Sequence, residues 1–447
     1  MHKSDGMNVY FDNAASTRVR DEAIEAMVNV MKDGFGNPSS MHSYGRFARD
    51  KLEEARGSLA EALGAKAECI YFTSGGTESN NWAILGAADL LIRKRGSPAK
   101  GVGREKLSDK EVLSDEGFSK NNELPPGKRL KSGRHIITSA IEHSAVLDPV
   151  KKLESKGFEV TYLEPDPSGH ITAEAFSNAL RDDTVFASIM LVNNETGAVN
   201  PVSEFSREIK RRGLGTILHT DAIQGLNKIP FTVKSIGADL VTVSSHKING
   251  PKGVGALCVK DGVKLAPLIL GGNHEKGLRG GTEPLPAAVG FGVAAKLGNE
   301  EFEETVEHVQ GLREYVSDLL MAEVPDIVFI SKGSVASGQQ SDSNSQRAYA
   351  KKSFSDYDYS PFILSISLPG HKSEVLMSYL DGEGICVSRS AACKKGARSR
   401  TLEAMHLNND VIDGALRVSF SRYNTKDEAE YFVKVLKKAA ETLYKAL

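Results

Sequence analysis

The chain has 447 residues, with 56 basic and 58 acidic side chains and a formal net charge of -2. A single hydrophobic core stops growing at roughly 250 to 300 residues, so this length predicts a large and a small domain. A hydrophobic content of 40% and a charged content of 26% argue against a disordered chain and against a membrane protein. The balanced charge leaves no field that gathers nucleic acid or anionic membrane, which favours a small-molecule substrate.

The four cysteines form no C-x-x-C pair and show no zinc-ligand spacing with histidine, so we expect no metal site. Their scarcity fits a reducing compartment. The first residues contain no apolar signal core, and no apolar run reaches the roughly 18 residues of a membrane span. We therefore expect a cytoplasmic protein without membrane contact.

Short apolar runs rich in Val and Ile alternate with helix-like segments through the first part of the chain. Strands buried on both faces need continuous runs of this kind, and helices between them are typical of parallel strands. The sequence therefore predicts an α/β fold with a mostly parallel, doubly wound sheet. The runs are CIYF at 69–72, HIIT at 135–138, VFASIMLV at 185–192, TILH at 216–219, DLVTVS at 239–244 and GALCV at 255–259.

Two polar stretches interrupt this pattern, at about 96–133 and about 331–358. The first is rich in Gly, Pro and basic residues with Phe118 as its one aromatic residue, so a solvated loop is favoured over a surface that binds RNA or an acidic partner. The second is low in complexity and is also predicted to be loop. We expect both to be mobile and dispensable, because their composition cannot bury enough apolar surface to offset the entropy of ordering.

The end of the chain has the pattern of a smaller α/β domain. Apolar runs again alternate with helix-like segments, and the last residues form an amphipathic pattern that predicts a closing helix. The runs are ILSISL at 363–368, ICVS at 385–388 and LRVSFS at 416–421.

Polar clusters follow several of the predicted strands in the large domain. In an open α/β sheet, ligands bind beyond the carboxyl ends of the strands, so these clusters are expected to meet. A turn at 73–79 with two glycines runs into a helix and could hold a phosphate, although small residues at such turns also occur for packing reasons. Further clusters occur at 141–143, 193–197 and 220–224, and the last, at 244–253, contains Lys247.

This set matches the needs of pyridoxal 5'-phosphate (PLP). PLP requires a lysine for a Schiff base, a carboxylate against its ring nitrogen, a flat group over the ring and a nest for its phosphate. Lys247, Asp221, His143 and the pair Gly76-Thr77 supply these groups in turn. The motifs of nicotinamide enzymes and of P-loop nucleoside triphosphatases are absent from the sequence.

These residues resemble a known family, the group I cysteine desulfurases of the NifS/IscS type, within the class V aminotransferase-like PLP enzymes. The resemblance extends from Tyr10 to the final helix, outside the two insertions. It implies a fold type I transferase with a seven-stranded-type sheet and a homodimer. It also implies conversion of L-cysteine to L-alanine, with a persulfide that passes to an iron–sulfur scaffold or a tRNA-thiolation protein.

The resemblance also implies a domain division. The large PLP-binding domain would comprise residues 18–283. The small domain would comprise residues 1–17 and 284–447, with a catalytic loop at about 388–400.

The resemblance implies roles residue by residue. Lys247 matches the Schiff-base lysine that also moves the α-proton, His143 matches the imidazole over the ring, and Asn194 matches a residue near the substrate and ring. The other matches are Asp221 on the ring nitrogen, Gln224 on the phenolic oxygen, Gly76, Thr77, Ser244 and His246 on the phosphate, Thr282 on the phosphate of a neighbouring subunit, and Asn37 and Arg417 on the substrate carboxylate.

Cys393 matches the family's catalytic thiol, with His143 as the candidate for moving its proton. The family usually shows V-S-S-G-S-A-C, whereas residues 387–393 read V-S-R-S-A-A-C, with Arg389 where small residues are usual. Cys386 lies in an apolar run and is expected to be a core residue. Two alternatives remain: a related PLP lyase or aminotransferase in which Cys393 is incidental, and a weakly active scaffold that binds partners through its insertions.

Overall fold

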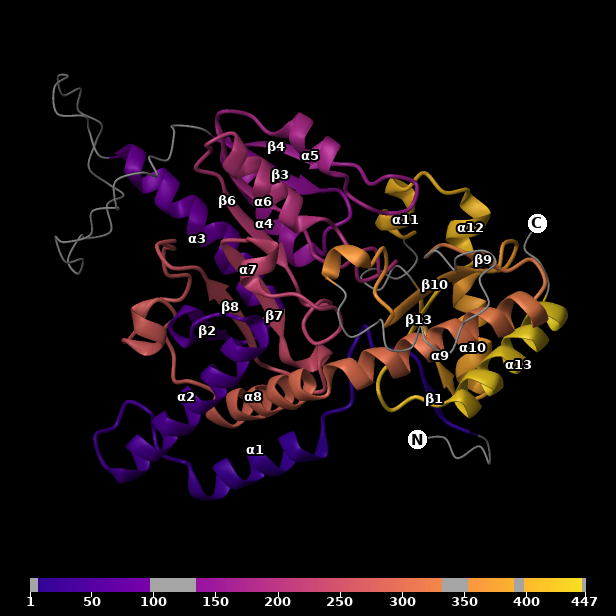
Figure 1. The fold of residues 1–447 in the computed structure, drawn as a ribbon, viewed down its shortest axis with the longest axis horizontal. Helices are drawn as coiled ribbons and strands as arrows, with labels where there is room; N and C mark the ends of the chain where they lie inside the picture. Colours follow the sequence, from indigo (N-terminus) through magenta and orange to yellow (C-terminus); the bar gives the residue numbers. More distant parts are fainter. Residues whose placement is uncertain (1–6, 97–133, 332–352, 390–397, 444–447) are drawn as a thin grey trace.

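The computed structural model describes residues 7–96, 134–331, 353–389 and 398–443 (Figure 1). The insertion at 97–133, most of the second insertion and Cys393 lie outside the described residues. Two packed units are visible, a large one around a wide sheet and a smaller one that contains β13 and α13.

The large unit is built on a seven-stranded sheet with the order β2-β8-β7-β6-β5-β3-β4. All of its neighbouring strands pair in parallel except those on either side of β8, which runs antiparallel to β2 and β7. The predicted fold class, α/β with a mostly parallel sheet, is confirmed. The strands are β2 (Ile70–Thr73), β3 (His135–Ser139), β4 (Glu159–Leu163), β5 (Thr184–Ser188), β6 (Ile217–Asp221), β7 (Leu240–Ser244) and β8 (Gly255–Val259).

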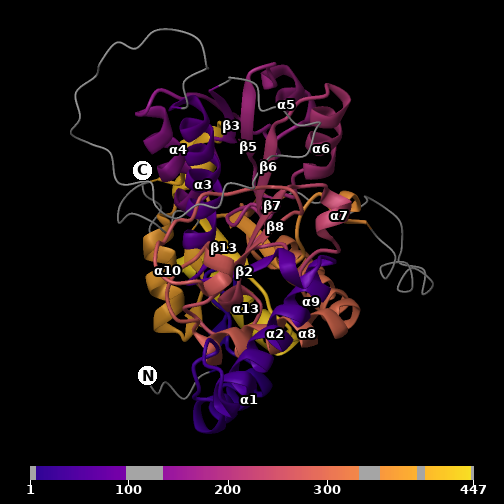
Figure 2. The same cartoon turned by 90° about the vertical axis from the view of Figure 1, so that its left-hand side faces the viewer.

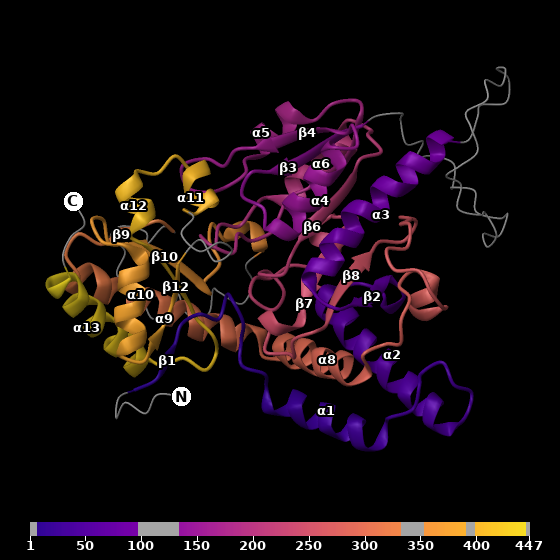
Figure 3. The same ribbon diagram turned by 180° about the vertical axis from the view of Figure 1, so that it is seen from behind.

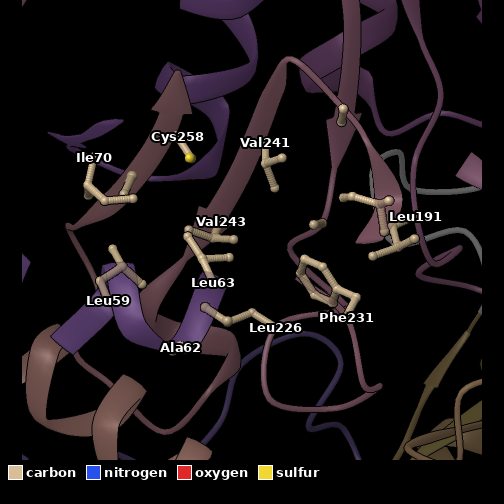
Figure 4. Packing of buried hydrophobic residues seen from close by; sticks show 14 of the residues in the cluster. Leu59, Ala62, Leu63, Ile70, Leu191, Leu226, Phe231, Val241, Val243 and Cys258 are labelled. Atoms are coloured by element: carbon tan, nitrogen blue, oxygen red, sulfur yellow. The ribbon is translucent and has the colours of Figure 1, made fainter. Parts of the chain in front are cut away.

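Helices cover both faces of this sheet, so alternate residues of one strand enter two different cores. Val241 and Val243 of β7 pack into the core that contains α2 and α8, whereas Leu240 packs into the core that contains α3 and α4. Figure 4 shows Val241 and Val243 facing Leu59 and Leu63 of α2. The helices are α1 (Asp21–Asp33), α2 (Ser43–Leu63), α3 (Gly76–Gly96), α4 (Ser144–Glu154), α5 (Ala173–Ala179), α6 (Val202–Arg211), α7 (Val233–Ile236) and α8 (Leu285–Glu300).

The small unit has an antiparallel sheet in the order β12-β13-β10-β9, beside a parallel pair of β1 and β11 (Figure 3). Phe11, just after β1, packs edge-on against Phe420 and Phe432, with ring centroids 5.4 and 5.7 Å away. The N-terminal segment therefore belongs to this core. The elements are β1 (Val9–Tyr10), α9 (Phe302–Glu323), β9 (Val328–Phe329), β10 (Ile363–Ser367), α10 (Ser373–Gly382), β11 (Ile385–Cys386), β12 (Ser388–Arg389), α11 (Arg400–Ala404), α12 (Asn409–Asp413), β13 (Ala415–Ser419) and α13 (Lys426–Thr442).

The predicted domain boundary at 283/284 is too early in the chain. Leu285, Ala288 and Phe291 of α8 are buried in the core of the large unit, and α8 packs along α1 and α2 (Figure 2). Apolar residues from both ends of α9 instead enter the small core. The change from the large core to the small core therefore falls near Glu301, between these two helices.

Two further expectations are corrected. The loop predicted over about 331–358 extends too far, because Phe354 is 3% exposed within the large core and the amide of Val199 donates to the carbonyl of Asp358 at 2.9 Å. Cys386 was expected in the core, but its side chain is exposed. Side chains alternate along a strand, and in the two-residue β11 the buried position belongs to Ile385.

None of the helices in the described ranges combines the length and the apolar character that crossing a membrane requires.

Candidate active site

The polar clusters predicted from the sequence follow the carboxyl ends of β2, β3, β6 and β7 in neighbouring parts of the large sheet. Lys247 closes a short 3₁₀ turn, Ser245–Lys247, directly after β7. Asp221 is the last residue of β6, the adjacent parallel strand. Parallel pairing of these strands brings the two side chains to the same edge of the sheet, as expected for a ligand site in this class of fold.

Lys247 is held by the N-terminal segment. Its Nζ donates to the carbonyls of Ala14 and Ala15 at 2.7 and 2.6 Å. Burial, together with the positive charge of Arg417, lowers the pKa of Lys247 to about 8, against the opposing effect of Asp12 and Asp221. The amine is therefore neutral in a much larger fraction of molecules near neutral pH than an ordinary lysine.

Asp221 is a buried carboxylate, and the hydrogen bonds it receives from described residues come from neutral groups. Its Oδ2 accepts from Asn80 Nδ2 at 2.7 Å, and its Oδ1 accepts from the amide of Ile223 at 3.0 Å. Burial raises its pKa, and it forms no ion pair with any described residue. A protonated ring nitrogen placed against this carboxylate would supply the missing positive charge.

The turn before α3 offers backbone donors for an anion. Gly76 begins the 21-residue α3, whose first N–H groups have no partner within the helix. A Cβ at Gly76 would lie 2.2 Å from Ile223 Cδ1 and 3.5 Å from Ser244 Cβ, so Thr77 and this turn sit close to the ends of β6 and β7. A larger residue at this position would displace the Ile223 side chain.

Two histidines flank this region in different protonation environments. Burial, with the nearby charge of Lys247, lowers the pKa of His246 to about 4, so its imidazole is neutral at physiological pH. His143 caps α4, and its Nδ1 accepts from the amide of Ala145 at 3.1 Å. A neutral His143 in this arrangement carries its proton on Nε2. Together with Thr77 and Lys152, His143 lines an open pocket.

Gln224 lies beside Lys247. Its Nε2 donates at 2.8 Å to the carbonyl of Ala14, which also accepts from Lys247. Three predicted residues, Lys247, Asp221 and Gln224, are therefore fixed at one site by backbone contacts.

Arg417 reaches this site from the small unit. It is 2% exposed in β13, its Nη2 pairs with Asp12 Oδ1 at 2.9 Å, and its Nη1 donates to the carbonyl of Asn194 at 2.9 Å. Its buried Nε has no partner among the described residues, which leaves a donor for an anionic ligand. Asn194 is thus beside Arg417.

Two predicted residues lie apart from this group within one chain. Asn37 is exposed in the connection between α1 and α2, which Figure 1 shows at the far side of the large unit from β13. Its Oδ1 accepts from the amide of Ser39 at 2.8 Å, a local turn contact. The structure therefore does not bring Asn37 to Arg417. Thr282 is exposed just after Arg279, whose Nε pairs with Glu78 of α3 at 2.8 Å.

Cys393 lies outside the described residues. The described residue Arg389, four positions earlier, pairs with Glu374 of α10 at 2.5 Å. That contact engages the atypical arginine with the small unit. The described ranges also place no three or more His, Cys, Asp or Glu side chains where they could share a metal ion.

Sequence reasoning assigned no role to several residues that complete the site. Asp12 pairs with Arg417, Asn80 binds Asp221, and Lys228 donates to Gln224. Asp12 lies within the N-terminal stretch that carries the family resemblance, so a signal existed for it. Lys228 stands four residues after Gln224, a spacing that could have suggested a contact only if the turn after β6 were known to curl like a helix.

Comparisons with known proteins agree with this geometry. The chain matches the aminotransferase class-V family over residues 9–97, 121–343 and 347–432. It is 36% identical over 437 residues to a protein named cysteine desulfurase IscS from Dictyoglomus turgidum, covering 97% of this chain and 95% of that protein. It is 34% identical over 452 residues to another of that name from Methanosarcina thermophila, covering 99% and 96% of the two chains.

A solved structure described as a NifS-like protein superposes with a TM-score of 0.80 at 32% identity, covering 98% of this chain and 100% of that one. Nearly the whole length of the chain is therefore shared with these proteins. The chain belongs to the aminotransferase class-V family, among the IscS/NifS-type cysteine desulfurases.

Proposed function

We propose that this protein is a PLP-dependent cysteine desulfurase, which converts L-cysteine to L-alanine and leaves the sulfur as a persulfide on Cys393. The observation that carries the proposal is the convergence of Lys247, Asp221 and Gln224 on one site, in a chain that aligns almost end to end with relatives named cysteine desulfurases. Similar folds host many reactions, so the residues at the site carry the argument together with the alignment.

The residues present fit PLP. Lys247 supplies an amine with a lowered pKa, and Asp221 supplies a buried carboxylate without a cationic partner among the described residues. The start of α3 at Gly76 and Thr77, together with Ser244 and His246, supplies donors for the phosphate. When bound, PLP provides an electron sink that lets bonds at the α and β carbons of an amino acid break.

The residues of the chain bind the substrate and transfer its protons and sulfur. Arg417, with its spare Nε, and Asn194 hold the substrate carboxylate. The neutral amine of Lys247 takes the α-proton of cysteine, and His143 is the candidate for moving the proton of a thiol. The Cys393 thiolate attacks the substrate sulfur: a sulfur–sulfur bond forms, the bond between sulfur and Cβ breaks, and the alanine carbon skeleton takes up protons.

The proposal includes a homodimer and an acceptor protein. Thr282 is exposed, and the Arg279–Glu78 ion pair fixes the segment that carries it, which suits a contact with the phosphate site of a second copy. A persulfide must pass its sulfur to another thiol or scaffold, so a sulfur-acceptor protein is the partner expected for this reaction.

The test is product analysis with the purified holoprotein. We expect alanine and sulfide from L-cysteine in the presence of dithiothreitol. Without reductant, mass spectrometry should find one additional sulfur on the peptide that contains Cys393. Cys393→Ser should keep its bound PLP but release almost no alanine, whereas Cys386→Ser, which removes a neighbouring exposed thiol, should remain active.

Other outcomes identify the alternatives. Wild-type turnover in Cys393→Ser would indicate a different PLP reaction in which this thiol is incidental. Wild-type protein that binds PLP but makes no alanine, while it captures an acceptor protein, would indicate a scaffold.

A further inference from the structure

A second lysine lies buried beside the site without a role in the proposed reaction. Lys228 is 5% exposed, and no carboxylate of a described residue lies within ion-pair distance of its Nζ. Lysines are almost never buried to this degree unless they are paired, because removing an ammonium group from water is costly. Lys228 and Lys247 line the same small cavity, together with Phe362 of the small unit.

The one hydrogen bond that Nζ of Lys228 makes within the described part of the chain is directed at Gln224. Nζ donates to Gln224 Oε1 at 2.6 Å, and it lies 5.9 Å from the centroid of the Phe362 ring. Burial, followed by the positive charges of Lys247 and Arg417, lowers the pKa of Lys228 to about 7. Charged or neutral, the Lys228 nitrogen has a hydrogen to donate.

This contact fixes which way the Gln224 amide faces. Gln224 Nε2 donates at 2.8 Å to the carbonyl of Ala14. If the amide turned over, its N–H₂ group would face the N–H donor of Lys228, and its oxygen would face the Ala14 carbonyl oxygen. The contact between the two carbonyl oxygens would be repulsive, and so would the contact with Lys228 whenever its nitrogen is an ammonium group, so Ala14 and Lys228 together select one orientation.

The selected orientation leaves a donor available. Nε2 carries two hydrogens, and the bond to Ala14 uses one of them. The Ala14 carbonyl also accepts from Lys247 Nζ at 2.7 Å, so the Gln224 amide nitrogen lies near the amine that would carry PLP. An anionic oxygen at that place, such as the phenolic oxygen of PLP, requires a donor and would be repelled by Gln224 Oε1.

We propose that Lys228 is a positioning residue, which holds the Gln224 amide so that Nε2 donates toward the phenolic oxygen of PLP bound at Lys247. The inference rests on the proposed cofactor site and adds a residue to it. It predicts that the hydrogen bond from Lys228, rather than its charge, is what the site requires.

The test compares two substitutions in the holoprotein. Lys228→Met keeps the length of the side chain and removes the donor, whereas Lys228→Gln keeps a neutral donor. We expect about tenfold weaker PLP binding in Lys228→Met and a rise of about one unit in the pH midpoint of its visible absorption, because a phenolic oxygen without its donor becomes more basic. Lys228→Gln should stay within about twofold of wild type.

Two controls separate this effect from general damage. Lys234→Met, at an exposed position on α7, should change neither quantity. The melting temperature of Lys228→Met should not fall, because an apolar side chain replaces a buried amine that lacks an ion-pair partner in the described ranges.

The PLP affinity and the absorption midpoint of these variants test the role of Lys228. Wild-type PLP affinity and absorption midpoint in Lys228→Met would overturn the proposal. Equal defects in the Met and Gln variants would assign the effect to charge and would also overturn it. Wild-type protein that binds no PLP, or makes no alanine, would instead overturn the proposed function.

Discussion

At the scale of single residues, burial shifts the pKa values of several groups in the site. Asp221, Lys247 and His246 all have pKa values shifted by loss of water toward their neutral forms. A bound cofactor with both cationic and anionic groups would restore charged partners to some of them. The site thus combines the amine of Lys247, whose neutral form is nucleophilic, with the carboxyl group of Asp221, which a cationic partner would ionise.

The pKa of Lys247 predicts how fast PLP enters the apoprotein. Only the neutral amine attacks an aldehyde, so the incorporation rate should rise with pH and level off near pH 8, whereas a lysine with an ordinary pKa of 10.5 would continue to rise. Stopped-flow absorption measures this rate. Arg417→Met should move the midpoint upward, because the positive charge of Arg417 helps to lower the pKa. A wild-type midpoint near 10 would contradict the assignment.

Glu142, next to His143, predicts a pH dependence of stability. Burial raises its pKa to about 8 from an ordinary value of 4.5, against hydrogen bonds from the Met190 amide and the Ser139 hydroxyl. Between these two pH values the folded state binds more protons than the unfolded state, so stability falls as pH rises. Relative to Glu142→Gln, the wild type should lose about 3 kcal/mol between pH 5 and pH 8 in urea unfolding.

The matched control is Glu25→Gln, at an exposed position on α1, which should parallel the wild type. A constant difference between wild type and Glu142→Gln across this pH range would mean that Glu142 is already ionised in the folded protein at pH 5.

At the scale of elements, the loop after β5 is joined to the start of α11. Glu195 Oε2 accepts from Ser399 Oγ at 2.5 Å, and Glu195 Oε1 accepts from Thr401 Oγ1 at 2.9 Å. Ser399 also caps α11, since its Oγ accepts from the amide of Leu402 at 3.1 Å. One carboxylate of the large unit therefore holds the helix that begins seven residues after Cys393.

Ser399→Ala should slow transfer of sulfur to Cys393 about tenfold without changing PLP absorption, and should cost about 1 kcal/mol of stability through the lost cap. Quantitative mass spectrometry of the persulfide measures the rate. Thr425→Ala removes a similar cap from α13, because the Thr425 side chain accepts from the amide of Glu428. If Thr425→Ala slows the transfer equally, the effect reflects stability and the anchoring role is wrong.

The sequence predicted the strands of the large sheet wherever burial on both faces produced a continuous apolar run. Fully buried strands such as β3, β5 and β8 appeared as apolar runs, and the polar residues after β6 and β7 marked the site. The edge strand β4 was missed as a distinct run because its residues are only partly buried. The contact between Asp12 and Arg417 spans 405 positions, and no local pattern encodes a pairing of that range.

At the scale of the whole molecule, one surface remains apolar. Met31, Phe35, Met41 and Tyr44 around the connection between α1 and α2 are all more than half exposed, and the rings of Phe35 and Tyr44 are 5.1 Å apart. Exposed apolar clusters of this kind mark protein contacts, and the proposed homodimer supplies a second copy to cover this one.

Phe35→Glu should therefore shift the protein from dimer to monomer, because it would bury an unpaired charge at the interface. Light scattering after gel filtration measures the mass. Leu270→Glu introduces the same charge at another exposed apolar position and tests whether the segment before Thr282 belongs to the same interface. A Phe35→Glu protein that remains dimeric with unchanged dissociation would place the interface elsewhere.

The contacts between the N-terminal segment and β13 have a consequence for synthesis on the ribosome. The residues of the large core precede the end of α8 with the exception of Phe354, so this unit has most of its packing partners while the last third of the chain is still being made. The carbonyls of Ala14 and Ala15 accept hydrogen bonds from Lys247. The segment that contains them is anchored to β13 through the hydrogen bond from Asn13 to the carbonyl of Ser419. In a nascent chain the large sheet can thus be folded while the proposed cofactor site remains incomplete until β13 leaves the exit tunnel.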